Sequence, residues 1–328
     1  MNRYLIAELK DWIEAPDVPL LLYGAPGVGK KTLAIELLEM YGKSYHIMDP
    51  RLPITVRLQD YDVLVLVDVE TMPPIPKRPV IIISTSKLSA SQTVRCFRVL
   101  PRDYKSLCTY SGGDPRCYEV GGMPLVIYSW MGPPDTTALQ YQRLLQYLFH
   151  PALKFALTVW EGIPYQLGRK FQYGLLQQEG RSKNFEGAID WLIQNGFAYK
   201  VYRLRHLPKE GSKECDIDLR AFKLYSIDSG ILRYMWAKDT RAQMAAALLL
   251  EQYILQELQH YPGIEIYYYT KPSSSYDVTF LCFYKGRWKA IGVRERINTN
   301  EKLFRSLPYE KLMMTPAMSF CRLGEFMQ

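Results

Sequence analysis

Residues 20–32 read LLLYGAPGVGKKT, an apolar run followed by a glycine-rich turn and two lysines. The turn contains the complete pattern G-x-x-x-x-G-K, from Gly24 to Lys30. The apolar residues before it predict a strand over residues 19–23, and the residues after it predict a helix over residues 29–41. In this setting backbone N–H groups at the helix start form a phosphate site, and the lysine reaches the β- and γ-phosphates. The stretch therefore predicts a nucleotide-binding site.

The residues expected to contact the nucleotide lie in this turn or at the start of the helix that follows. They are Gly24, Gly27, Val28, Gly29, Lys30, Lys31 and Thr32. A Ser or Thr normally follows the lysine and binds Mg²⁺, but Lys31 occupies that position. Thr32 does not replace it, because a helix turns by about 100° per residue. We expect ATP or ADP to bind, Mg²⁺ to be held weakly, and hydrolysis to be slow or absent.

A second strand is predicted over residues 61–68, where YDVLVLVD is an apolar run that ends in Asp68. At that end Asp68 would hold Mg²⁺, directly or through water. The alternative is a turn residue that merely ends the strand. Many ATPases place a glutamate directly after this carboxylate, but here Val69 follows and Glu70 comes next. Glu70 would share the direction of Asp68 only if the strand extends that far.

Further strands are predicted over residues 44–48 and 79–86, so that strands alternate with helices in this part of the chain. Such alternation predicts an α/β fold with a parallel sheet. Ligands of these sheets bind beyond the carboxyl ends of the strands. Residues 24–30, Asp68 and residues 84–86 are therefore expected to converge on one crevice.

Composition restricts the class of protein. The chain has 328 residues, 48% of them hydrophobic, which is enough for two or three globular domains. No apolar run is long enough to span a bilayer and no leader pattern is present, so we expect a cytoplasmic protein without membrane contact. Six scattered cysteines and four histidines predict neither a disulfide framework nor a zinc site. The net charge of +8 is mild and spread along the chain.

Composition and periodicity also predict four units. The first is the nucleotide-binding domain, and a glycine-bordered, leucine-rich segment with a helix over residues 137–160 forms a helical lid on it. A winged helix-turn-helix and a C-terminal α+β unit follow. The expected boundaries are 1–110, 111–165, 166–227 and 228–328.

The winged helix-turn-helix is predicted from a helix over residues 170–178, a second helix ending at Gly196, and two strands over residues 198–204 and 222–227. The exposed face of the second helix carries Glu186 and Asp190, which oppose contact with phosphates. Contact with a protein partner is therefore as reasonable as contact with DNA, and DNA is not favoured. The basic residues that would bind DNA are Lys183, Arg203 and Arg205.

The order of these features resembles the prokaryotic predicted AAA-superfamily ATPases that carry a C-terminal domain of unknown function. The likeness rests on the glycine-rich turn, the strands that end at Asp68 and Ser86, and the winged helix. It also rests on four further stretches, residues 95–101, 121–126, 223–232 and 251–258. The resemblance implies an α/β P-loop NTPase core of AAA type, a helical lid, a winged helix, and a C-terminal module of restriction-endonuclease-like fold.

The resemblance also identifies where a nuclease site would lie. The family usually has Glu-Val-Asp-Phe on one strand and Glu-Val-Lys on the next, and these carboxylates hold a metal. Here the two stretches read DVTF, residues 277–280, and GVR, residues 292–294. Thr279 and Gly292 replace two carboxylates, and Glu295 faces the other way if the strand is regular. We expect this module to be inactive as a nuclease.

Three functional interpretations remain open. The first is an ATP- or ADP-dependent switch or scaffold with little hydrolysis. The second is a slow AAA-type ATPase in which Asp68 and Glu70 are catalytic and Arg95 or Arg98 stabilises charge. The third is a DNA-binding regulator or defence-system component that uses the winged helix. The resemblance implies ATP rather than GTP, and the guanine-reading pattern Asn-Lys-x-Asp is not found.

Overall fold

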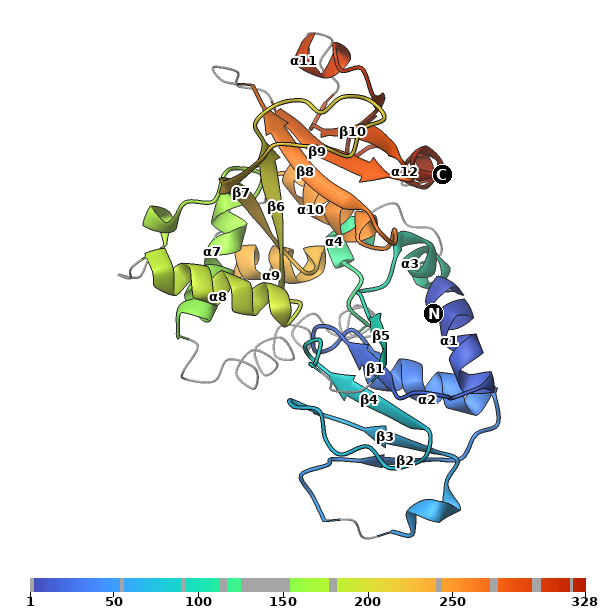
Figure 1. Cartoon of the computed structure of the whole chain (residues 1–328). Coiled ribbons are helices and arrows are strands. Elements are labelled where there is room, and N and C mark those ends of the chain that lie inside the picture. Colours follow the sequence, from blue (N-terminus) through green and yellow to red (C-terminus); the bar gives the residue numbers. More distant parts are fainter. Residues whose placement is uncertain are drawn as a thin grey trace.

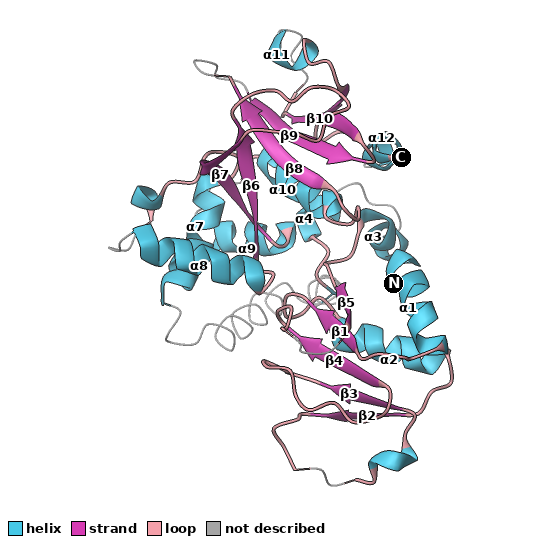
Figure 2. Ribbon diagram, viewed as in Figure 1, coloured by secondary structure: helices cyan, strands magenta, loops and turns pink. Residues whose placement is uncertain are grey.

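The computed structural model describes residues 3–53, 56–89, 93–111, 117–124, 154–176, 182–239, 244–271, 277–296, 302–318 and 321–328. Two β-sheets organise this part of the chain, and each is accompanied by helices (Figures 1 and 2). In Figure 1 the first sheet lies in the lower half and the second in the upper half. None of the described helices is long and apolar enough to cross a membrane.

The first sheet is parallel throughout, with strand order β2-β3-β4-β1-β5. Every position of β3 and β4 is buried, as expected of continuous apolar runs in a sheet covered on both faces. The predicted α/β fold with a parallel sheet is confirmed. The strands are β1 (Leu20–Tyr23), β2 (Tyr45–Met48), β3 (Val63–Leu66), β4 (Val80–Ser84) and β5 (Arg95–Arg98).

The helix predicted after β1 is present, and a further helix precedes β1. The indole N–H of Trp12 donates to the carbonyl of Val18 at 2.6 Å, which holds the end of the first helix against the start of β1. The helical segments of this part are α1 (Arg3–Glu14), α2 (Lys30–Met40), the 3₁₀ turn η1 (Leu58–Asp60), α3 (Tyr104–Ser111) and α4 (Cys117–Val120).

The second sheet is mixed, with strand order β11-β10-β9-β8-β6-β7. β6 pairs with β7 in antiparallel fashion and with β8 in parallel fashion. Hydrogen bonding therefore continues across the boundary expected between residues 227 and 228. The strands are β6 (Ala198–Leu204), β7 (Ile217–Ser226), β8 (Glu265–Thr270), β9 (Asp277–Tyr284), β10 (Arg287–Val293) and β11 (Glu310–Met314).

The helical segments of the second half differ from the prediction at one place. The helix predicted over residues 170–178 is wrong: the backbone N–H of Phe171 donates to Phe222 in β7, and a 3₁₀ turn follows. Most of the lid helix predicted over residues 137–160 lies outside the described residues. The segments are α7 (Lys154–Gln166), η3 (Tyr173–Leu175), α8 (Ser182–Gln194), α9 (Ser229–Asp239), α10 (Ala246–Leu258), α11 (Lys302–Arg305) and α12 (Cys321–Met327).

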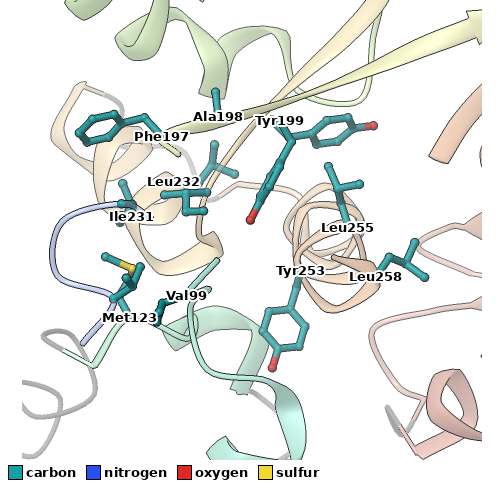
Figure 3. Close-up of a cluster of buried hydrophobic side chains, with 14 of the residues drawn as sticks. Val99, Met123, Phe197, Ala198, Tyr199, Ile231, Leu232, Tyr253, Leu255 and Leu258 are labelled. Atoms are coloured by element: carbon teal, nitrogen blue, oxygen red, sulfur yellow. The ribbon is translucent and has the colours of Figure 1, made fainter. Parts of the chain in front are cut away.

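One hydrophobic core extends from the first sheet to the second. At the junction, Val99 after β5 and Met123 after α4 pack with side chains of β6, α9 and α10 (Figure 3). Burying these apolar surfaces together stabilises the arrangement of the two halves. The labelled residues of this cluster are Val99, Met123, Phe197, Ala198, Tyr199, Ile231, Leu232, Tyr253, Leu255 and Leu258.

Candidate functional site

The glycine loop, residues 24–29, connects β1 to α2. Gly24, Gly27 and Gly29 have φ angles of +148°, +78° and +89°. Gly29 is the N-cap residue of α2, and its carbonyl accepts the N–H of Leu33 at 2.8 Å. A β-carbon at position 24 would collide with the carbonyl oxygen of Val99, so the loop also needs glycine there to approach the end of β5. The loop is thus held against two strands at the start of a helix.

Lys30 turns its side chain into this loop. It is buried, and its Nζ donates to the carbonyl oxygens of Gly24 at 2.6 Å and Ala25 at 2.8 Å. Burial lowers the pKa of Lys30 to about 8, and the nearby carboxylate of Asp68 partly opposes that shift. A buried ammonium at a helix N-terminus is a centre of positive charge with few solvent contacts.

Asp68 lies at the same edge of the sheet as the glycine loop. Tyr23 of β1 is paired with Ser84 of β4, and Leu66 of β3 is paired with Ile82 two residues earlier in β4. Residues 24, 68 and 84 therefore converge at the carboxyl ends of the strands, as predicted. Asp68 is exposed and has a left-handed φ of +54°, so its backbone turns away from the strand direction.

Glu70 does not continue β3, which ends at Leu66. Its carboxylate is exposed and lies 3.8 Å from Nη1 of Arg51. The condition for Glu70 to share the direction of Asp68, a strand that extends to residue 70, is not met. Lys31 and Thr32 are both exposed in the first turn of α2.

The two arginines proposed for charge stabilisation lie at opposite ends of β5. Arg98 is paired in register with Tyr23, next to the glycine loop, whereas Arg95 is paired with Leu20 at the far edge. Arg95 is therefore about 10 Å from the candidate site along the strand. The guanidinium of Arg98 lies over the ring of Tyr199, 5.4 Å from its centroid.

Segments distant in sequence contact the glycine loop. Gly196, after α8, has φ +75°, and a β-carbon there would lie 2.9 Å from the backbone nitrogen of Ala25. A β-carbon on Gly29 would lie 3.4 Å from the side chain of Pro124. Nearby, the hydroxyl of Thr85, after β4, donates a hydrogen bond to the side-chain oxygen of Asn195, after α8, at 3.3 Å. The glycine loop thus contacts the second half of the protein at Gly196 and the segment after α4 at Pro124.

Asp228, which the sequence analysis did not select, fixes the segment that leads to Pro124. Its carboxylate accepts the N–H of Gly122 at 2.5 Å and, as a cap of α9, the N–H of Ile231 at 3.1 Å. Burial raises the pKa of Asp228 to about 6, against the effect of these backbone donors. An Asp between the end of a strand and the start of a helix is a recognisable N-cap signal, but its second partner is far away in sequence.

Thr279 and Gly292 stand where the resemblance would place metal-binding carboxylates, and both positions are involved in packing or hydrogen bonding instead. The Thr279 hydroxyl oxygen accepts the backbone N–H of Val293 at 3.1 Å. The side chain of Met313 occupies the space beside Gly292 that a larger side chain would need. Glu295 accepts the N–H of Ala247, near the start of α10, at 2.8 Å. Within the described ranges, no three His, Cys, Asp or Glu side chains are grouped to hold a metal ion.

The basic residues considered for DNA contact are partly neutralised by carboxylates. Arg203 pairs with Asp218 at 2.5 Å, and Arg205 pairs with Asp216 at 2.7 Å. Lys183 is exposed in the first turn of α8. Charges already paired on the same hairpin contribute less to phosphate binding than free ones.

Part of the chain is similar to a known protein family. A family model described as a domain of unknown function (DUF8612) matches residues 115–243. This segment contains Gly122, Gly196 and Asp228, whereas the glycine loop lies before it. No curated protein matches the chain.

Proposed function

We propose that the protein binds ATP or ADP at the glycine loop and acts as a nucleotide-dependent switch or scaffold with weak or no hydrolysis. The observation that carries this proposal is the buried ammonium of Lys30, enclosed by the loop carbonyls of Gly24 and Ala25. A buried cation is costly unless an anion or strong acceptors surround it. A β-phosphate would replace these carbonyls as the partner of Lys30 and accept N–H groups from residues 27–29.

This proposal includes an AAA-like P-loop NTPase core in the first 110 residues, located in the cytoplasm. Asp68 supports it because its carboxylate, which follows β3, acts electrostatically on Lys30, which follows β1 on the other side of β4. The same carboxylate would hold any Mg²⁺ that accompanies the nucleotide. Mg²⁺ would be weakly held, because Lys31 stands where a hydroxyl ligand is usual.

Little hydrolysis is expected for two reasons. Water activation needs a base near the γ-phosphate, but Glu70 lies in an exposed ion pair with Arg51. Lys31 supplies positive charge without a metal-binding oxygen. These features favour a switch over a slow ATPase of ordinary type.

A switch also requires that the occupied and empty sites affect another part of the molecule differently. The contacts of Gly196 with Ala25 and of Pro124 with Gly29 offer such a route. A phosphate that reorganises the glycine loop would press on both contacts. The arrangement of the winged-helix segment and the C-terminal module would then depend on the bound nucleotide. A protein partner would bind one of these arrangements in preference to the other.

Calorimetric titration with ATP, ADP and GTP, each with and without Mg²⁺, tests this proposal. ATP and ADP should bind, GTP should bind more weakly, and omission of Mg²⁺ should weaken binding only a few-fold. A parallel phosphate-release assay should give little turnover. Absence of binding by all three nucleotides would refute the proposal.

A further inference from the structure

A second feature with the properties of a ligand site is a cavity of about 470 Å³. It lies between the end of β5, the helix α8, the strand β6 and the segment from α10 to β8. Its volume falls in the range of about 300–1,000 Å³ that is typical of small-molecule sites. No residue of the glycine loop lines it, so it is distinct from the proposed nucleotide site.

Arg98 supplies a cation to this cavity. Its guanidinium packs over the ring of Tyr199, and no carboxylate in the part of the chain that the structure describes forms an ion pair with it. A guanidinium has five N–H donors that suit a carboxylate or phosphate. An anion in the cavity would provide the acceptors.

Tyr199, the ring beneath that guanidinium, gives the second observation. It is 5% exposed, and its buried hydroxyl has no hydrogen-bond partner. Burial raises the pKa of Tyr199, so the hydroxyl remains protonated and able to donate. A buried hydroxyl without a partner is unfavourable and calls for an acceptor.

The other charges of the cavity compensate each other. The Nζ of Lys200 lies 3.6 Å from the carboxylate of Asp190 and 4.7 Å from the ring centroid of Phe222. Arg98 is therefore the cation whose charge remains unbalanced at this site. Ile193 and Ile264 provide an apolar part of the wall.

We propose that the cavity binds a small molecule that carries one carboxylate or phosphate group on an apolar body. Arg98 and the Tyr199 hydroxyl hold the anionic group, and Ile193 and Ile264 contact the apolar body. Because β5 belongs to the first sheet and β6 to the second, the ligand touches both halves of the protein.

Ligand-observed NMR titration of the full chain with phenyl phosphate and with benzoate tests this site. At least one probe should bind, and Arg98→Gln and Tyr199→Phe should each weaken that binding by tenfold or more. Arg95→Gln, on the same strand but outside the cavity, is the matched control and should leave binding unchanged. The stronger probe then distinguishes a phosphate ligand from a carboxylate ligand. Failure of both probes to bind the wild type, or equal binding by Arg98→Gln, would overturn the proposal.

The glycine loop could also attract phenyl phosphate, and the variant Lys30→Met separates the two sites. Phenyl phosphate should still bind Lys30→Met at the cavity. Loss of binding in this variant would show that the probe binds the glycine loop, and would refute the cavity site. Tyr199→Phe keeps the ring and removes an unpartnered hydroxyl, so its melting temperature without ligand should equal or exceed that of the wild type. A lower melting temperature would mean that the hydroxyl already has a partner and would also count against the site.

Discussion

Gly196 and Ala25 lie in contact although 171 positions separate them: a β-carbon on Gly196 would come within 2.9 Å of the Ala25 backbone nitrogen. Gly196 lies in the turn after α8 in the second half of the protein, and Ala25 belongs to the glycine loop. The turn after α8 thus rests directly on the loop that we propose binds phosphate.

The substitution Gly196→Ala tests the importance of this contact. It should reduce the free energy of unfolding by about 2–4 kcal/mol, because it combines a strained positive φ with a collision against backbone. Gly211→Ala is the matched control, since Gly211 has a similar φ of +78° with nothing within 4 Å of an added β-carbon. The control should cost only about 1 kcal/mol in denaturant unfolding. Equal reductions in the free energy of unfolding for the two variants would mean that the glycine loop moves away from the added β-carbon without a measurable loss of stability.

Asp228→Asn should change how stability depends on pH. Burial raises the pKa of Asp228 from 3.8 to about 6, so the native state binds the proton more tightly than the unfolded state. Its contribution to stability is complete below about pH 4 and is lost as the pH rises through 6. The free energy of unfolding of wild type minus that of Asp228→Asn should therefore fall by about 2 kcal/mol between pH 4.5 and pH 7. Urea unfolding of both proteins across this range measures the difference, and a constant difference would contradict the assigned environment.

Nucleotide binding should take up a proton at alkaline pH. Burial lowers the pKa of Lys30 to about 8 in the free protein, and a bound phosphate would raise it again. Uptake should increase from about a quarter of a proton at pH 7.5 to nearly one at pH 9, and affinity should fall over the same range. Calorimetry in two buffers of different ionisation enthalpy gives the number of protons. Uptake that stays constant with pH would show that Lys30 does not face the phosphate.

Lys31→Thr should increase Mg²⁺-dependent ATP turnover, because it places a hydroxyl where Mg²⁺ is usually bound. Both Lys31 and its neighbour Thr32 are exposed in the first turn of α2, so the substitution should not disturb packing. Lys43→Thr, which changes an exposed lysine beyond the end of α2, serves as the control and should leave turnover unchanged. An unchanged rate in Lys31→Thr would refute the explanation offered for weak hydrolysis.

Local patterns were sufficient to predict much of the secondary structure. Continuous apolar runs predicted β3 and β4, and the Gly196 turn was predicted as the end of α8. The helix over residues 170–178 was wrong because the Phe171 N–H bonds to Phe222, a partner 51 residues away. A local pattern carries no information on such a partner.

The candidate site was also predictable in outline, because its main residues lie next to strands that local patterns predict. The turn, the lysine and Asp68 lie next to strands whose parallel order follows from their alternation with helices. The contacts of Asp228 with Gly122 and of Gly196 with Ala25 join residues more than 100 positions apart. The cavity beside Arg98 likewise depends on how the two sheets meet, which no single stretch of sequence specifies.

The most direct test of the central claim is titration of ATP into wild type, Lys30→Met and Lys31→Met at pH 7.5. Methionine is unbranched and only one atom shorter than lysine but carries no charge, so the fold should be retained, which circular dichroism would verify. We expect wild type to bind ATP, Lys31→Met to bind within a few-fold of it, and Lys30→Met to lose binding by at least 100-fold. ATP binding of equal strength by wild type and a folded Lys30→Met would contradict the account.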